Sequence, residues 1–187
     1  QNNTLVSNFS EDHTKVIYLK NSRDSSVYGN YIEWNATGIG KNAYGVYFEV
    51  TGGSTSTNNN IYNNIIYLNS LASAYGVYIS SLGYTNENVF DNNSIDIIST
   101  SGNGLYFLNL VSTIDSNEIK NNNISLNCPS LSDGIGLGHA GGSSMNNNVF
   151  LNNNLSILGN PSSKTINEIG SGSGVNYLIY NNSFGEI

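Results

Sequence analysis

The sequence predicts an all-β protein, a parallel β-helix (solenoid) of about six coils with roughly 30 residues per coil. Three observations point to this fold class. A short motif returns at a nearly constant interval, short segments alternate apolar with polar or aromatic residues, and no segment of useful length has a helical period. We therefore expect residues 1–187 to form a single elongated domain.

The repeated motif is a β-branched residue followed three positions later by asparagine. It occupies residues 27–30, 61–64, 89–92, 119–122, 149–152 and 179–182, at intervals of 34, 28, 30, 30 and 30 residues. Equivalent residues of a stacked fold lie above one another, and an amide can both donate and accept along the stack. Asparagine also tolerates the left-handed backbone of a sharp corner. We therefore expect an amide ladder at one corner, formed by Asn30, Asn64, Asn92, Asn122, Asn152 and Asn182.

Two further strands are expected in each coil. The first has an apolar residue on each side of a central residue, which is tyrosine in four of the five cases: residues 17–19, 46–48, 77–79, 105–107 and 135–137. The second follows the asparagine motif, at residues 66–68, 95–97, 124–126 and 155–157. A glycine precedes four of the former, where we expect a backbone conformation that other residues resist (Gly45, Gly76, Gly104 and Gly134). The inward side should form one core that includes Ile66, Val77, Ile95, Leu105, Ile124 and Ile135.

Aromatic residues form two columns that alternation places on the outside. One contains Tyr28, Tyr62, Phe90, Phe150 and Tyr180, with Lys120 between them, and the other contains Tyr18, Tyr47, Tyr78 and Tyr106. Stacked rings can simply shield a sheet, or they can form a platform for sugar rings or a partner surface. For the second interpretation the candidate binding residues are Tyr47, Tyr78, Tyr106, Tyr62 and Phe90.

Composition and charge exclude several function classes. Only 10% of the residues are charged, 35 are asparagine, and the formal net charge is −7, which argues against a nucleic-acid partner. No apolar run reaches the roughly 18 to 20 residues of a membrane span. Cys128 is the only cysteine, so no internal disulfide can form; we expect an inert small side chain in a turn at residues 127–129, with an intermolecular bridge as the alternative. His13 and His139 lie far apart in the sequence, so no metal site or cofactor is predicted.

The strings at residues 59–64 and 75–79, Asn-Asn-Ile-Tyr-Asn-Asn and Tyr-Gly-Val-Tyr-Ile, are similar to the repeats of right-handed parallel β-helix proteins. The chain resembles this class, which has pectate-lyase-like architecture, and in particular its Asn-rich secreted bacterial surface type. The resemblance implies a right-handed helix and a secreted or cell-surface location. It implies little about activity, because the same fold serves lyases, hydrolases, tailspikes and adhesins.

The weak catalytic candidates are Asp133 and His139. Their segment is faintly similar to two elements of polygalacturonase-type hydrolases, but Ala140 replaces a glycine and the neighbouring Asp-Asp pair is missing. Glycoside hydrolysis needs two carboxyl groups about 5 to 9.5 Å apart. Two pairs, Asp91 with Asp96 and Glu87 with Glu118, have sequence positions that permit this spacing.

We therefore expect a secreted structural or adhesive rod, a surface fibre or stalk that presents aromatic stripes to glycans or partner proteins. The alternative is a carbohydrate-active enzyme, a hydrolase or lyase, on a neutral polysaccharide. The chain is expected to be a segment of a longer repeat protein, with residues 1–15 as a partial first coil or cap. Its expected partners are further repeats or other copies stacked end to end, and glycans. The 34-residue interval should be absorbed by a loop near residues 54–57.

Overall fold

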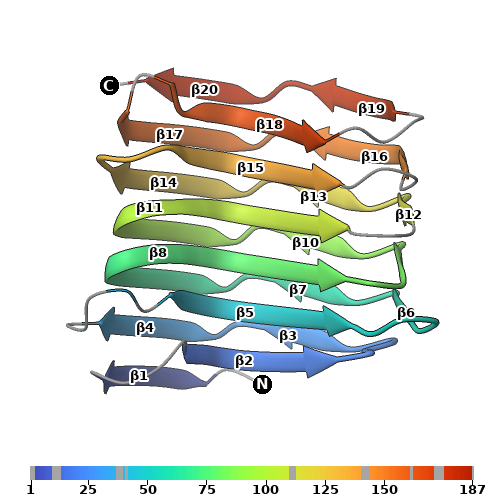
Figure 1. Cartoon of the computed structure of the whole chain (residues 1–187), viewed down its shortest axis with the longest axis horizontal. Coiled ribbons are helices and arrows are strands. Elements are labelled where there is room, and N and C mark those ends of the chain that lie inside the picture. The colour runs from blue at the N-terminus through green and yellow to red at the C-terminus, as the bar shows by residue number, and fades with distance from the viewer. Residues whose placement is uncertain are drawn as a thin grey trace.

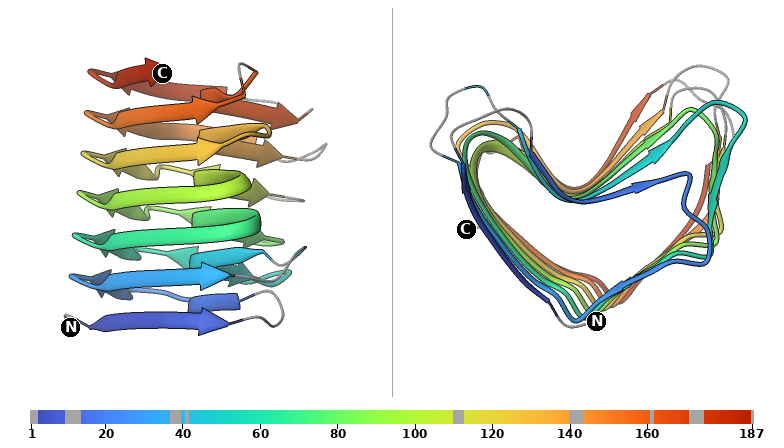
Figure 2. Two further views of the ribbon diagram at one scale, coloured as in Figure 1. Left: turned by 90° about the vertical axis from the view of Figure 1, so that its left-hand side faces the viewer. Right: turned by 90° about the horizontal axis from the view of Figure 1, so that it is seen from below.

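The computed structural model describes residues 3–9, 14–36, 40, 42–109, 113–139, 144–160, 162–170 and 175–186. All regular secondary structure within these residues is β-strand. The strands of successive coils pair in parallel, and the coils stack along one axis (Figure 1). The expected all-β parallel solenoid is confirmed. Viewed from the N-terminal end, the chain runs clockwise as it recedes, so the solenoid is right-handed (Figure 2).

The described strands pair into two sheets. The 11-stranded sheet contains β1 (Thr4–Phe9), β2 (Thr14–Lys20), β4 (Tyr31–Ala36), β5 (Ala43–Val50), β8 (Ile65–Ser81), β11 (Ser94–Asn109), β14 (Asn123–Cys128), β15 (Ser132–His139), β17 (Asn154–Gly159), β18 (Lys164–Gly170) and β20 (Ser183–Glu186). The 9-stranded sheet contains β3 (Ser26–Tyr28), β6 (Thr55–Thr57), β7 (Asn60–Tyr62), β9 (Tyr84–Asn86), β10 (Val89–Asp91), β12 (Thr113–Asp115), β13 (Glu118–Lys120), β16 (Ser144–Leu151) and β19 (Val175–Tyr180). The long strands β8 and β11 bend and so contribute to two faces.

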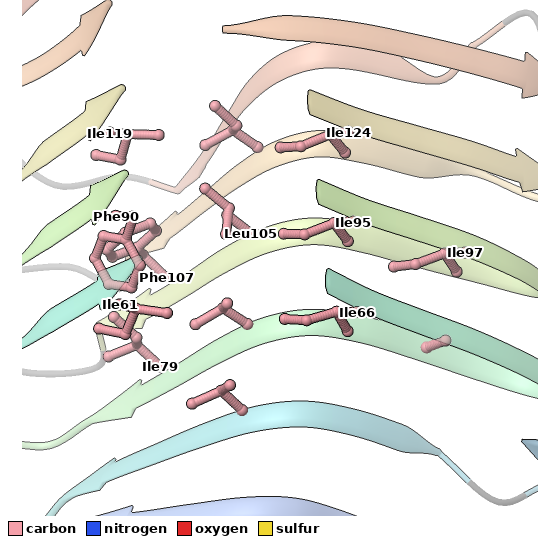
Figure 3. Close-up of a cluster of buried hydrophobic side chains, with 14 of the residues drawn as sticks. Ile61, Ile66, Ile79, Phe90, Ile95, Ile97, Leu105, Phe107, Ile119 and Ile124 are labelled. Atoms are coloured by element: carbon pink, nitrogen blue, oxygen red, sulfur yellow. The ribbon is translucent and has the colours of Figure 1, made fainter. Parts of the chain in front are cut away.

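The core is one continuous apolar column between the sheets (Figure 3). All six residues expected inside are buried: Ile66, Val77, Ile95, Leu105, Ile124 and Ile135 are each at most 1% exposed. Each such side chain contributes about 1.5–3 kcal/mol by leaving water. Cys128 is buried as well, with its Sγ 3.3 Å from the hydroxyl of Ser99. The predicted core is therefore confirmed for these six side chains.

The predicted repeat register is wrong by one residue in the third and fifth units. Pairing of the strands gives the inward column Val27, Ile61, Phe90, Ile119, Phe150 and Ile179, at intervals of 34, 29, 29, 31 and 29 residues. Phe90 and Phe150 are both 0% exposed, whereas Val89 and Val149 are not in this column. The large apolar ring, and not the β-branched residue before it, points inward because the corner asparagine fixes the alternation.

An inner ladder of asparagines does line one corner, with the corrected register. It contains Asn3, Asn30, Asn64, Asn93, Asn122, Asn153 and Asn182. The amide of Asn93 shows the arrangement: its Nδ2 donates to Oδ1 of Asn122 at 3.0 Å and to the carbonyl of Ile61 at 2.8 Å. Its Oδ1 accepts from both the backbone N–H and Nδ2 of Asn64, at 3.1 and 2.9 Å. Each buried amide therefore satisfies groups of the coil before it and the coil after it.

Asn92 and Asn152 do not belong to the inner ladder. They occupy the neighbouring outer column, which contains Gly29, Asn63, Asn92, Asn121, Asn152 and Asn181 and has φ between 51° and 62° throughout. The side chains of this column are exposed, and several bond along the stack, as Asn92 Nδ2 does to Asn63 Oδ1 at 2.8 Å. The left-handed backbone that we assigned to the ladder thus belongs to the residue before each ladder asparagine from Asn30 to Asn182.

A second inner ladder, which the sequence analysis did not identify, lines the next corner. Its members Asn59, Asn88, Asn117 and Asn148 are linked from Nδ2 to Oδ1 at 2.9, 2.9 and 3.0 Å. Each is at most 3% exposed. The residues just before them again have positive φ, namely Asn58, Glu87, Ser116 and Asn147. Two corners of the coil therefore have the same construction, a residue with positive φ followed by a buried asparagine.

The 34-residue interval is not absorbed where the sequence analysis placed it. Thr55–Thr57 forms β6 and pairs with β9 at an interval of 29 residues. The five additional residues lie in two places: three between Ala36 and Ala43, and two between Val50 and Thr55. Of the predicted loop, only Ser54 lies in such an insertion. It ends a turn in which its backbone N–H donates to the carbonyl of Thr51.

Candidate functional site

The outline of the solenoid is indented along the face formed by β2, β5, the C-terminal halves of β8 and β11, β15 and β18 (Figure 2). The indentation lies where strand alternation is interrupted. In β5, the adjacent residues Gly45 and Val46 are both buried, and Tyr44 and Tyr47 on either side are both partly exposed. The strand bends at this point, so side chains three residues apart project into the same concave face.

The glycines at the bend are required by close packing and not by an unusual φ. A Cβ on Gly104 would lie 2.4 Å from Cγ2 of Ile124 on the opposite wall and 2.7 Å from the carbonyl oxygen of Gly134. Gly45 and Gly76 meet equivalent obstructions. None of these glycines has positive φ, which corrects the expectation from the sequence. The concave wall therefore approaches the opposite wall so closely that no side chain fits.

Six tyrosines gather on this concave face, and we call them the tyrosine face: Tyr18, Tyr44, Tyr47, Tyr75, Tyr78 and Tyr106. Three of the four ring pairs one coil apart stack, and the fourth, Tyr18 with Tyr47, is tilted by 46°. The centroids of Tyr47 and Tyr78 are 5.1 Å apart with 17° between planes, and those of Tyr44 and Tyr75 are 5.2 Å apart at 9°. The predicted column of Tyr18, Tyr47, Tyr78 and Tyr106 is confirmed, and Tyr44 and Tyr75, which were not predicted to belong to this surface, lie beside it.

The two tyrosine columns also contact each other edge to face. Tyr75 meets Tyr78 at 4.9 Å and 78°, and Tyr44 meets Tyr47 at 5.0 Å and 87°. Aromatic pairs of these kinds contribute about 0.5–1.5 kcal/mol each beyond their burial. The rings thus use most of their faces on one another. What they present outward is ring edges and phenolic hydroxyls, so the surface suits hydrogen bonding better than stacking of a sugar ring.

Charged groups lie at the N-terminal end of the tyrosine face. The ammonium of Lys15 lies 3.9 Å from the centroid of Tyr47 and 4.6 Å from that of Tyr18, which is a cation–π arrangement. The hydroxyl of Tyr18 donates to a carboxylate oxygen of Glu49, and this bond raises the pKa of Tyr18 to about 12. Burial raises the pKa of Tyr78. These phenols therefore remain protonated, neutral donors at physiological pH.

Asp133 lies at the other end of the tyrosine face, in the column that continues from Tyr75 through Asn103. It is 6% exposed, its Oδ2 accepts from Nδ2 of Asn167 at 3.2 Å, and its Oδ1 is buried without a hydrogen-bond partner. Burial raises the pKa of Asp133, and the bond from Asn167 and the charge of Lys164 oppose that effect. Burial of Asp133 therefore favours its neutral acid form.

Asp133 and His139 are not brought together. They lie six residues apart on β15, which places their Cα atoms roughly 20 Å apart along an extended strand. A proton relay between them would need about 3 Å between side-chain atoms. The two weak catalytic candidates therefore do not form one site.

The five predicted binding residues separate into three environments. Tyr47, Tyr78 and Tyr106 lie together on the tyrosine face. Tyr62 stacks on Tyr28 at 5.0 Å on the 9-stranded sheet, away from that face. Phe90 is wholly buried and packs edge to face on Phe107 at 5.3 Å, so the expectation that its ring faces outward is wrong.

A pocket of about 460 Å³ lies on the 9-stranded sheet, where the sequence analysis predicted no site. Its lining residues are Thr55, Tyr84, Asn86, Thr113 and Asp115. They come from β6, β9 and β12 and form two adjacent outward columns. Their period of 29 residues is visible in the sequence, but without the corrected register these positions cannot be assigned to one face.

The described residues contain no group of three or more His, Cys, Asp or Glu side chains able to hold a metal ion. In the same part of the chain, no helix has the length and apolar character needed to cross a membrane. Comparison of the chain with protein-family models, curated proteins and solved structures finds no match. The geometry described above is therefore the basis for a functional proposal.

Proposed function

We propose that this chain is a structural or adhesive rod of a secreted or cell-surface fibre or stalk. The observation that supports this proposal is the unbroken linkage of buried amides along the axis. In the first ladder, each amide from Asn3 to Asn153 donates to the amide one coil further on, at 2.9 to 3.3 Å. Any axial displacement of one coil breaks buried hydrogen bonds at two corners, so the stack resists extension and shear.

The tyrosine face is the adhesive surface in this proposal. Its hydroxyls stay protonated, so Tyr47, Tyr78 and Tyr106 offer neutral donors and acceptors to a neutral glycan or to a partner protein. A substrate with many negative charges would meet a net charge of −7. A neutral polar partner avoids that repulsion.

Force spectroscopy along the axis tests the rod. We expect unfolding in steps of about 100 Å, the contour length of a 29-residue coil at roughly 3.5 Å per residue. Asn93→Ala should lower the unfolding force, and Asn92→Gly, in a column where Gly29 already stands, should leave it unchanged. Smooth extension at low force, or equal effects of the two variants, would contradict a ladder that resists extension.

The adhesive surface is tested with a variant that preserves the ring stacks. Replacing Tyr47, Tyr78 and Tyr106 by Phe removes only the hydroxyls. Retention on neutral polysaccharides should fall in this triple variant and persist in a control that carries Tyr28→Phe and Tyr62→Phe on the other sheet. Equal retention of the two variants would contradict the assignment of the tyrosine face as the adhesive surface.

The alternative, a carbohydrate-active enzyme on a neutral polysaccharide, rests on the raised pKa of Asp133. The two acid pairs from the sequence do not support it. Asp91 and Asp96 belong to different sheets, and Glu118 is in register with Val89, not with Glu87. The test is whether the chain releases reducing ends from neutral polysaccharides. If it does, and Asp133→Asn abolishes the release, the enzymatic function would replace the structural one as the proposal.

A further inference from the structure

The pocket on the 9-stranded sheet has a simple construction. Thr55, Tyr84 and Thr113 form one outward column, because Thr55 pairs with Tyr84 and Thr113 precedes the partner of Thr85. Asn86 and Asp115 form the next column. The residues between the columns point inward, since Thr85 is 0% and Ile114 is 1% exposed. The floor of the pocket is therefore backbone, and its two walls are side chains.

Tyr84 has the free ring that the tyrosine face lacks. It is 56% exposed, and within the described part of the chain no other ring stacks on it. The opposite wall carries a carboxylate. Asp115 Oδ1 accepts from Ser116 Oγ at 3.2 Å and from Asn147 Nδ2 at 3.1 Å, while Oδ2 has no partner among the described residues.

We propose that this pocket binds a small organic ammonium ion. Tyr84 and Asp115 are one coil and two residues apart, which places their Cβ atoms about 8 Å apart. An ammonium group within about 6 Å of the ring centroid can then also approach the carboxylate. The volume of about 460 Å³ lies in the range of roughly 300–1,000 Å³ typical of small-ligand sites.

The electrostatic surroundings favour a cation. Glu87, next to Asn86, is exposed, and the formal charge of the chain is −7. Arg23 shares the column of Asp115 but lies three coils away from it, about 14 Å, which exceeds a screening length of about 8 Å at physiological ionic strength. It is one coil from Thr57, at the Thr55 end of the pocket, and the exposed carboxylate of Asp24 stands beside it in the chain. The chain already holds one ammonium over its rings, since Lys15 Nζ lies 3.9 Å from the centroid of Tyr47.

Titration of the whole chain with choline, followed by NMR, tests this site. We expect saturable shifts at Tyr84 and Asp115 that weaken as salt is added. The uncharged carbon analogue of choline, 3,3-dimethylbutan-1-ol, should bind at least about tenfold more weakly, because it keeps the shape and loses the charge. Sedimentation with phosphatidylcholine vesicles then distinguishes a headgroup from a free ion: co-sedimentation would assign the headgroup, and its absence the free ion.

Variants separate charge from shape. Asp115→Asn and Tyr84→Leu should each weaken choline binding by about tenfold. Asp96→Asn makes the same charge change on the other sheet and should leave it unaltered. Four results would overturn the proposal. They are equal affinity for choline and its uncharged analogue, unchanged choline affinity in Asp115→Asn, tighter binding of methyl glucoside than of choline, and no saturable shift at Tyr84. The analogue experiment uses the unaltered chain, so it does not depend on how the variants fold.

Discussion

Asn92 and Asn93 are neighbours at one corner of the coil, yet the structure uses them for different physical reasons. Asn93 is 1% exposed, and its amide joins three coils by four hydrogen bonds. Asn92 is exposed and has a φ of 51°, a conformation that asparagine and glycine adopt at little cost. The same residue type is therefore selected for its amide on the inner side and for its backbone on the outer side.

The largest effect should come from the inner asparagine. Asn93→Ala removes the acceptor of the backbone N–H of Asn64, one of the two acceptors of Asn64 Nδ2, and a donor to the carbonyl of Ile61. With each unsatisfied group costing about 1–3 kcal/mol, we expect a loss of about 3–5 kcal/mol in the free energy of unfolding. Urea denaturation measures it. Asn92→Gly should change stability by less than about 0.5 kcal/mol, and a large loss there would erase the distinction between the two columns.

Glycines extend the comparison from the corner to the wall. Gly104→Ala forces a methyl group against Ile124, so we expect a loss of about 1–3 kcal/mol, the usual cost of overpacking. Gly52→Ala is the matched control, because no atom lies within 4 Å of its added Cβ. Thermal melts of the two variants measure the difference. Equal melting temperatures would show that the concave wall can move away from the core.

Asp133 is a buried acid on an outer face and should make stability depend on pH. Because burial raises its pKa above the ordinary 3.8, the folded chain holds this proton more tightly than the unfolded chain. The stabilisation is complete below about pH 4 and is lost as pH rises through the raised pKa. Asp133→Asn should remove that part of the decline, and Asp96→Asn should not. The urea midpoint measured across this range would contradict the account if both variants keep the decline of the parent.

The smallest effect is expected at an outer corner position that lacks the preferred residue. Glu87 has a φ of 56°, and its side chain is exposed and accepts a long hydrogen bond of 3.4 Å from Oγ1 of Thr57. Glu87→Asn should stabilise the chain by about 0.5–1 kcal/mol, because asparagine adopts this backbone more readily. A calorimetric melt below that of the parent would show that the backbone of this corner is not what selects the residue.

Much of the fold could be predicted from the sequence because a stack repeats each local choice at a constant interval. The three strands of each coil, the buried faces of Ile66 and Leu105, and the column of Tyr47 and Tyr78 all followed from alternation and period. The error lay at Val89-Phe90, where two apolar residues in succession fit either register. Alternation alone cannot choose between them.

The asparagine doublets carried the missing information. In the doublets at 63–64, 92–93, 121–122 and 152–153 the second asparagine is the buried one, and a further buried asparagine stands five residues before it, as Asn59 does before Asn64 and Asn88 before Asn93. This constant spacing would have set the register and revealed the second ladder. The pocket at Tyr84 could not be predicted from the sequence, because it depends on which outward columns are adjacent across three coils.

Hydrogen exchange of the asparagine side-chain amides is the most direct test of the central claim, that buried amides linked coil to coil hold the stack together. NMR can follow the Nδ2 protons of the unaltered chain in D₂O. We expect the amides of Asn93 and Asn122 to exchange far more slowly than those of Asn92 and Asn121, because only the former are buried and bonded on both sides. Equal, fast exchange at all four residues would contradict the account.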